Sequence, residues 1–234
     1  MHTLQHTATA WGLVLSEAQI EQFQTYAREL QDWNARVNLT AITTTEGIVV
    51  RHFLDSLRCA LSWGEAPGSL IDIGTGAGFP GLPLKLLRPE LRLTLVESIE
   101  KKAAFLRHLV ALLGLREVEV LTARAEALGR DPQQRERYDV AVGRAVADLR
   151  VLAEYCLPLC RVGGRFLAPK GEQVAAELDE ARAALRILGG GDPLVEVVRL
   201  PETEPRSLVV VPKIAPTPPQ YPRGVGVPAR RPLG

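Results

Sequence analysis

A run of glycines between residues 69 and 81 constrains the fold more than any other part of this 234-residue chain. A short apolar run precedes the glycines and is typical of a strand that a parallel sheet buries on both faces. The apolar residues are Leu70, Ile71 and Ile73, and the glycines at every second position are Gly74, Gly76 and Gly78. Glycine allows a positive φ and has no Cβ to keep a ligand off the backbone. Pro80 suits the first turn of a helix, so the stretch predicts a strand, a ligand-binding loop and a helix.

Two classes of nucleotide ligand use such a loop. Read from Gly76, the stretch matches the dinucleotide fingerprint, but Asp72 would then aim a carboxylate at a pyrophosphate, and like charges repel. Read from Gly74, it resembles the first motif of S-adenosylmethionine-dependent methyltransferases, whose cofactor carries a sulfonium and an ammonium that a carboxylate attracts. We therefore expect Asp72 and the three glycines to bind S-adenosylmethionine, with a dinucleotide oxidoreductase as an alternative.

An acidic residue follows at the expected distance. Residues 92–96 alternate and end in apolar side chains, which predicts a second strand, and Glu97 lies at its carboxyl end, 23 positions beyond Gly74. This architecture binds ribose hydroxyls with an acidic residue about 20 residues after the loop. The alternatives for Glu97 are a solvated strand end or a cap for the next helix. Ser98 is predicted to cap that helix, which carries Lys101, Lys102 and Arg107 on its polar side.

The alternation of strands and helices continues downstream. Further strands are predicted at 117–121, 138–142 and 165–168, with helices at 148–161 and 174–188, and a final pair of strands near 194–200 and 207–211. Strand followed by helix, repeated, predicts a parallel sheet that helices cover on both faces. The final pair must be antiparallel, because the short link between its strands cannot hold a crossover. Ligands of such sheets bind at the carboxyl ends of the strands, which places Gly74, Glu97, Ala125, Glu126, Arg144 and Lys170 along one rim.

The first 66 residues are predicted to form a helical extension, ahead of a main domain at 67–213 and a tail at 214–234. A capping box at residues 16–19 begins one helix, and a second helix runs from about Thr45 to Leu57. Arg51 and Asp55 share a polar face of this second helix, with His52 and Arg58 nearby, and this face is either solvated or the rim of a substrate site. Residues 64–68 form the predicted linker into the sheet.

Composition adds a few limits. With 46% hydrophobic residues and a net charge of +1, the chain suffices for one sizeable core plus a small extra element. Three cysteines, Cys59, Cys156 and Cys160, suggest small core residues, the last two on one helix face, and the four histidines show no ligand spacing, so we expect no metal site. With no signal peptide and no apolar run near the roughly 18 residues of a spanning helix, we expect a soluble, cytoplasmic protein.

The tail has a charge of its own. No acidic residue follows Glu204, whereas Arg223, Arg230 and Arg231 are spaced along a proline-rich segment. Residues 216–219 favour an extended polyproline conformation with little ability to pack. An extended basic segment suits a phosphate backbone, so the tail is predicted to be an RNA arm. The alternative is that Tyr221 and Leu233 anchor it to the main domain.

Several strings together resemble the GidB or RsmG family, the guanine-N7 methyltransferases of small-subunit ribosomal RNA. The strings are Asn38-Leu39-Thr40-Ala41-Ile42, Arg51-His52-Phe53-Leu54-Asp55-Ser56, the glycine stretch from Asp72 to Gly81, Gly143-Arg144-Ala145-Val146-Ala147 and Lys170-Gly171. The similarity covers about residues 16–212, and the tail resembles the carboxyl end of many members. The strings before the glycine stretch are the family-specific part.

This resemblance implies the class I methyltransferase fold: a Rossmann-like, seven-stranded, mostly parallel sheet whose last strand pair is antiparallel, with an N-terminal helical extension. It also implies S-adenosylmethionine contacts at Gly74, Phe79, Glu97, Ser98, Ile99, Ala125, Glu126 and Arg144. The substrate is then a guanine in the decoding-region loop of the small subunit, taken as free RNA or in the assembled particle, and we expect a monomer. A methyltransferase acting on another RNA, a protein or a small molecule, and a binding protein that has lost catalysis, remain alternatives.

Guanine N7 has a lone pair and no proton, so its methylation needs orientation and no general base. Arg144 and Lys170 are the candidates for holding the base or a phosphate, unless they pair with carboxylates of the rim. RNA contacts are predicted at Arg51, His52, Lys101, Lys102, Arg107, Arg223, Arg230 and Arg231.

Overall fold

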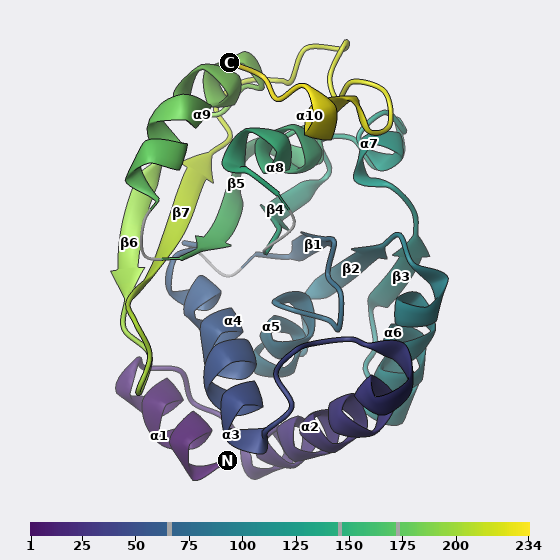
Figure 1. Cartoon of the computed structure of the whole chain (residues 1–234), viewed down its shortest axis with the longest axis vertical. Helices are drawn as coiled ribbons and strands as arrows, with labels where there is room; N and C mark the ends of the chain where they lie inside the picture. Colours follow the sequence, from purple (N-terminus) through teal and green to yellow (C-terminus); the bar gives the residue numbers. More distant parts are fainter. Residues whose placement is uncertain (65–66, 145–146, 172–173) are drawn as a thin grey trace.

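A twisted sheet forms the middle layer of the computed structural model, which describes residues 1–64, 67–144, 147–171 and 174–234 (Figure 1). Within these residues seven strands are joined in the order β3-β2-β1-β4-β5-β7-β6. The strands are β1 (Ser69–Ile73), β2 (Arg92–Glu97), β3 (Val118–Thr122), β4 (Tyr138–Val142), β5 (Cys160–Lys170), β6 (Leu194–Val198) and β7 (Arg206–Pro212). Strands β1 to β5 pair in parallel, and β7 pairs antiparallel with β5 and β6. The predicted mostly parallel sheet with an antiparallel end is confirmed.

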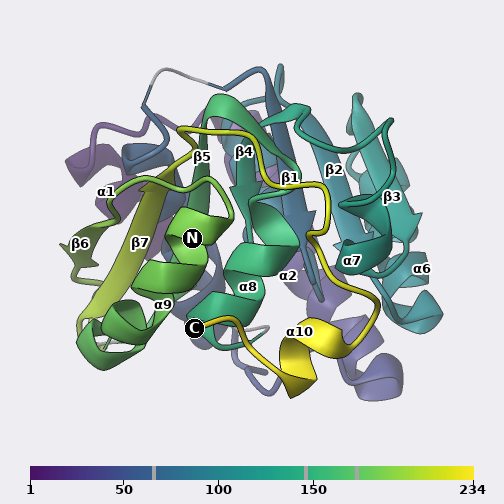
Figure 2. The same cartoon turned by 90° about the horizontal axis from the view of Figure 1, so that it is seen from above.

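Helices cover both faces of this sheet, as Figure 2 shows from above. One face carries α1 (His2–Ala10), α2 (Glu17–Val37), α3 (Thr45–Ile48), α4 (Asp55–Leu57), α5 (Gly81–Leu87) and α6 (Glu100–Leu112). The other carries α7 (Ala125–Leu128), α8 (Leu149–Cys156), α9 (Ala175–Ile187) and α10 (Val227–Arg230). No helix in the described part of the chain is long and apolar enough to cross a membrane.

Two apolar cores lie on either side of the sheet, because successive side chains of a strand point to opposite faces. Leu70 packs in one core with Phe23 and Phe53 from the N-terminal helices. Ile71, the next residue of β1, packs in the other core with Leu152 of α8 and Leu185 of α9. The N-terminal extension is therefore helical as predicted, but it shares a core with the sheet. Residues 65–66 of the predicted linker lie outside the described residues.

The second predicted helix exists but is irregular. Its middle, Val49–Leu54, is a π-helical turn, and a 3₁₀ turn, Arg58–Leu61, follows α4. Such wide turns inside helices are common at functional sites. The turn brings the face of Asp55 inward, where this side chain is fully buried. The solvated alternative is therefore wrong for His52, Asp55 and Arg58, whereas Arg51 is exposed.

Three local predictions need correction. Ser98 does not cap α6, because the residue before the helix is Ile99 and no side chain caps it; Glu97 instead accepts a hydrogen bond from the Ile99 amide at 2.9 Å. The predicted helix 148–161 ends at Cys156, and β5 begins at Cys160 because its early residues already pair with β4. Cys156 and Cys160 thus share no helix face, but both are buried as predicted, and Cys59 is buried too.

The C-terminal tail packs against the domain and is not an extended arm. Tyr221 and Leu233 contact the core beneath α8 and α9, and Figure 2 shows the tail crossing this helical layer in yellow. Its backbone is held by side chains distant in sequence: the Arg135 guanidinium donates to the carbonyls of Thr217 and Tyr221 at 2.6 and 2.7 Å. These partners stabilise a proline-rich segment whose own backbone groups form few hydrogen bonds with one another. The predicted extended conformation of the tail is wrong, and its anchoring by Tyr221 and Leu233 is confirmed, whereas RNA contacts of its exposed arginines remain a prediction.

Candidate active site

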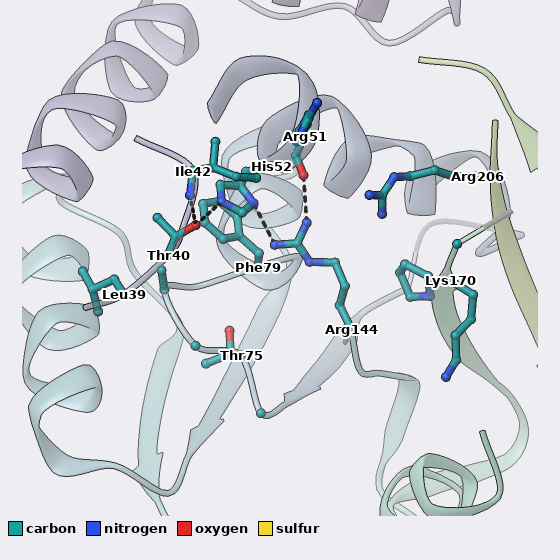
Figure 3. A pocket seen from close by; sticks show the side chains of 15 residues that line it. Leu39, Thr40, Ile42, Arg51, His52, Thr75, Phe79, Arg144, Lys170 and Arg206 are labelled. Atoms are coloured by element: carbon teal, nitrogen blue, oxygen red, sulfur yellow. Dashed lines mark hydrogen bonds between the residues drawn. The ribbon is translucent and has the colours of Figure 1, made fainter. Parts of the chain in front are cut away.

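A basic pocket opens at the carboxyl ends of β1, β4 and β5, where the glycine loop meets the N-terminal helices (Figure 3). Its volume is about 470 Å³. Its lining residues are Leu39, Thr40, Ile42, Arg51, His52, Gly74, Thr75, Gly76, Ala77, Phe79, Arg144, Pro169, Lys170, Gly171 and Arg206. Among these described residues four carry a cationic side chain and none carries a carboxylate. The pocket therefore suits a ligand with hydrogen-bond acceptors or negative charge.

A narrow pocket of about 70 Å³ lies on the other side of the loop and shares Gly74 with the basic pocket. Its lining residues are Ile73, Gly74, Val96, Ser98, Ala123, Arg124, Ala125, Glu126 and Tyr155. Tyr155 was not predicted from the sequence, because it comes from α8. Burial and the neighbouring Glu126 carboxylate raise the pKa of Tyr155 to about 12, so its hydroxyl stays protonated. Glu126 itself is buried and accepts a hydrogen bond from the Gly226 amide of the tail at 2.8 Å.

The glycines of the loop have different tasks. Gly74, Gly76 and Gly78 all have positive φ, as predicted. A Cβ on Gly76 would meet nothing within 4 Å, so this part of the loop is open to a ligand. A Cβ on Gly78 would lie 2.6 Å from the Tyr26 hydroxyl oxygen and 2.5 Å from Leu82 Cδ1. Gly78 therefore serves packing and lines neither pocket, contrary to its predicted role in binding.

Asp72 also has a structural task. Its side chain is fully buried, and Oδ2 accepts hydrogen bonds from the Thr75 hydroxyl and the Gly81 amide, both at 2.7 Å. Within the described residues Oδ1 has no partner, and burial raises the pKa of Asp72 to about 6. The carboxylate therefore ties the two ends of the loop together from below. The predicted direct contact with a cofactor is not supported by this position.

Glu97 lines neither pocket, but it is bonded to Gly76 of the basic pocket and precedes Ser98 of the narrow one. Its Oε2 accepts a hydrogen bond from the Gly76 amide at 3.1 Å, and its Oε1 accepts the Ile99 amide. Each carboxylate oxygen has a further lone pair, so Glu97 can still accept hydrogen bonds from a ligand. Its neighbour Ser98 lines the narrow pocket, whereas Ile99 is half-exposed and lines neither. Of the predicted contacts after β2, Glu97 and Ser98 are therefore well placed.

An aromatic stack fixes the far end of the glycine loop. The Phe79 ring lies parallel to the Tyr26 ring at 5.3 Å and to the His52 ring at 4.3 Å. The Tyr26 hydroxyl also donates a hydrogen bond to the Ala77 carbonyl at 2.6 Å. Stacked rings at these distances attract one another, so α2 and the π-helical turn hold the loop from outside. The family-specific N-terminal strings thus contribute directly to the shape of the pocket.

Arg144 is held in place at the end of β4. Its Nη1 donates to Asp55 Oδ2 at 2.9 Å and to the Arg51 carbonyl at 3.1 Å, and Nη2 lies 3.0 Å from His52 Nδ1 (Figure 3). Burial, with the Arg144 charge second, lowers the pKa of His52 to about 3. A neutral His52 accepts at Nδ1 from the guanidinium and donates from Nε2 to the Thr40 hydroxyl at 2.8 Å. His52 is therefore neutral with both ring nitrogens engaged, and its predicted RNA contact remains a prediction.

Asp55 is shared by several arginines. Its buried carboxylate lies 3.2 Å from Arg58 Nε, 2.9 Å from Arg144 Nη1 and 3.8 Å from Arg206 Nε. Arg58 was expected near this polar face, whereas sequence reasoning missed Arg206 as part of the site, because nothing in the sequence pointed to this residue of β7.

The Lys170 ammonium pairs with a carboxylate at the edge of the pocket. Its Nζ lies 2.6 Å from Glu177 Oε1 and 2.9 Å from the Ala147 carbonyl oxygen. In Figure 3 its amine points away from Arg206, so only its stem lines the basic pocket. Pairing with a carboxylate was the alternative for both candidates, and Arg144 shows it too. The difference is that Arg144 extends across the pocket, whereas the Lys170 ammonium is directed out of it.

The comparisons with known proteins agree with this geometry. A family model described as rRNA small subunit methyltransferase G matches residues 19–204. The chain belongs to this family. The protein named Ribosomal RNA small subunit methyltransferase G from Roseiflexus sp. strain RS-1 is 68% identical over the whole of both chains. The protein of the same name from Chloroflexus aggregans is 55% identical, with 98% of this chain and 97% of the relative covered.

Two solved structures have a fold similar to that of this chain. A putative S-adenosylmethionine-dependent methyltransferase from Methanococcus maripaludis has a TM-score of 0.55 at 12% identity, covering 81% of this chain and 92% of that one. A Corynebacterium glutamicum protein has a TM-score of 0.53 at 21% identity, covering 89% and 95%. The strings that carried the resemblance converge around the basic pocket; Ala145 and Val146 lie outside the described residues.

The remaining predicted RNA contacts lie outside both pockets of the family member. Lys101 and Arg107 are exposed and Lys102 is half-buried on α6, and Arg107 pairs with Glu100 at 2.6 Å. Arg223 pairs with the buried Glu154 at 2.6 Å and is not free for RNA. Arg230 and Arg231 are exposed near α10, so their predicted RNA contact remains a prediction.

Proposed function

We propose that this rRNA methyltransferase transfers a methyl group from S-adenosylmethionine to N7 of a guanine in small-subunit ribosomal RNA, with the guanine in the basic pocket. The observation that carries the proposal is the pair of pockets joined at Gly74. An elongated ligand can pass from one pocket to the other across this glycine, because no Cβ stands in its way. The family membership supports both the methyl donor and the RNA substrate.

The residues present fit S-adenosylmethionine. Ile73, Val96, Ala125 and Tyr155 give the narrow pocket the apolar walls that an adenine needs. Glu97, bonded to the Gly76 amide, is placed to accept ribose hydroxyls. The open surface at Gly76 faces the basic pocket and can hold the methionine half. When bound, the cofactor supplies a methyl group on a positively charged sulfur.

The chain contributes orientation. Guanine N7 has a lone pair and no proton, so no side chain has to remove one, and orientation can supply about 7–11 kcal/mol of the barrier. His52 is neutral with both ring nitrogens engaged, and no carboxylate is found among the described lining residues of the basic pocket. Arginine commonly binds guanine through O6 and N7 together, which would block the methyl acceptor. Asp55, the Arg51 carbonyl and His52 engage three of the five N–H donors of Arg144, which leaves the Nε–H and one Nη2–H for a ligand.

Replacing the target guanine by 7-deazaguanine tests the proposal, because the acceptor atom becomes a C–H. We expect methyl transfer to stop while the RNA still binds. Mass spectrometry of the nucleosides from an unmodified RNA substrate should locate the methyl on N7. Transfer to the deaza substrate would show that another atom is methylated.

A further inference from the structure

We propose that Arg206 and Arg51 form a phosphate subsite at the mouth of the basic pocket, which binds the RNA backbone beside the target nucleotide. This inference rests on the proposed function and adds to it the place where the RNA strand enters. Arg206 is the first residue of β7, and Arg51 belongs to the π-helical turn. Figure 3 shows the Arg206 guanidinium directed across the opening of the pocket toward the Arg144 side.

The charges around Asp55 do not balance. One buried carboxylate faces the guanidinium groups of Arg58, Arg144 and Arg206, and His52 is neutral. Within the described residues Asp55 Oδ1 and Arg58 Nη1 are buried without hydrogen-bond partners. The cluster therefore carries an excess of positive charge next to a pocket whose described lining offers no other carboxylate. Such an excess attracts an anion.

Arg206 is the member of the cluster that an outside anion can reach. Its side chain is 37% exposed, whereas that of Arg144 is 14% exposed and that of Arg58 is fully buried. At 3.8 Å its contact with Asp55 is also the longest of the three. The Lys170 ammonium is already neutralised by Glu177. Arg206 thus keeps most of its donors for a ligand.

A neighbouring groove shows where the rest of the RNA would go. It lies between the 41–50 segment and the 201–203 turn, and it shares Ile42 and Arg51 with the basic pocket. Its other lining includes the hydroxyl-bearing residues Thr43, Thr44 and Thr203 and the carboxylates Glu46 and Glu202. These carboxylates repel a phosphate, so a nucleotide whose base fills the basic pocket is expected to leave its phosphate at the Arg51 junction, and the hydroxyls of the groove can contact the sugar or base of the next nucleotide. Arginine suits the phosphate because its planar fork presents two parallel donors.

The methionine carboxylate of the cofactor is the other anion that these arginines might meet, and the experiment separates the two sources. Arg206→Gln is compared with Arg186→Gln, an exposed arginine on α9 on the opposite face of the sheet. Three quantities are measured: RNA affinity against salt concentration, S-adenosylmethionine affinity by calorimetry, and melting temperature. Arg206→Lys tests whether charge alone suffices.

We expect Arg206→Gln to lower RNA affinity about tenfold or more and to make the slope of log affinity against log salt shallower by about 0.7–0.9, the effect of one phosphate contact. Arg206→Lys should keep the slope but recover only part of the affinity, and Arg186→Gln should change neither. An unchanged slope, or a loss confined to S-adenosylmethionine affinity, would overturn the proposal. The slope is also measurable with 7-deazaguanine RNA, so it is independent of whether N7 is the acceptor.

Discussion

The tail forms an ion pair with α8 through Arg223 and Glu154, and Arg223→Ala tests how much this pair stabilises the fold. Glu154 is fully buried, and its carboxylate accepts hydrogen bonds from Arg223 Nε at 2.9 Å and Nη2 at 2.6 Å. The variant removes the guanidinium but leaves the Arg223 amide, which donates to Glu154 Oε1 at 2.7 Å. A buried carboxylate then remains with one hydrogen bond and no opposite charge.

Breaking a buried ion pair from one side costs about 3–5 kcal/mol. The retained amide and the partial exposure of Arg223 reduce this, so we expect the free energy of unfolding to fall by about 2–4 kcal/mol. For a chain of this size the melting temperature should then fall by about 5–15 °C. The double variant Glu154→Gln, Arg223→Ala removes both charges and should recover most of the loss.

The wild type, Arg223→Ala and the double variant are compared by denaturant and thermal unfolding. Their RNA affinities are also measured at several salt concentrations. The tail as a strap predicts lower stability with an unchanged salt dependence. A melting temperature within about 1 °C of the wild type, with a salt slope shallower by about 0.7–0.9, would refute the reasoning and restore Arg223 as an RNA contact.

Three further outcomes are expected. Glu97→Ala should weaken S-adenosylmethionine binding tenfold or more in calorimetry, because charge-assisted hydrogen bonds contribute about 1.5–3 kcal/mol each, and Glu97→Gln should be milder; equal affinity would remove Glu97 from the site. The pKa of His52 is lowered to about 3 in the folded state, so protonation of this ring favours the unfolded chain. The contribution of neutral His52 to the free energy of unfolding is therefore complete above pH 6.5 and is lost as the pH falls from 6.5 to about 3. The stability difference between wild type and His52→Gln should therefore fall by up to about 1.4 kcal/mol per pH unit below 6.5, and a pH-independent difference would contradict this. Gly78→Ala should lower the melting temperature more than Gly76→Ala, whereas Gly76→Ala should lower cofactor affinity more; the reverse order would exchange their roles.

The fold could be predicted because its signals are local. The apolar run that contains Ile71 is a buried strand whatever lies around it, and the short link before β7 allows only an antiparallel pair. The ends of β5 could not be predicted, since they depend on two partners, β4 and the antiparallel β7. The buried partners of Asp55 likewise come from distant segments, with Arg144 just after β4 and Arg206 on β7.

The residues of the candidate site also divide into those that the local sequence predicts and those that only the folded structure reveals. Gly74, Gly76 and Glu97 follow from the order of strand, loop, helix, strand and acid, which the sequence displays directly. Asp72 and Gly78 have the residue types of a binding loop, but contacts with Gly81 and Tyr26 give them structural tasks. The same limit applies to Arg206 and Tyr155, whose neighbours become known only after the chain has folded.

The position of the tail in the chain has a consequence for synthesis. Gly226, whose amide holds Glu126 at the wall of the narrow pocket, and Arg223, which neutralises Glu154, are translated after all seven described strands. A nascent chain that has reached Lys213 contains the whole sheet, but Glu154 still lacks its counter-charge and Glu126 its amide partner. The wall of the narrow pocket at Glu126 and the ion pair of Glu154 are thus completed only when the tail emerges and docks.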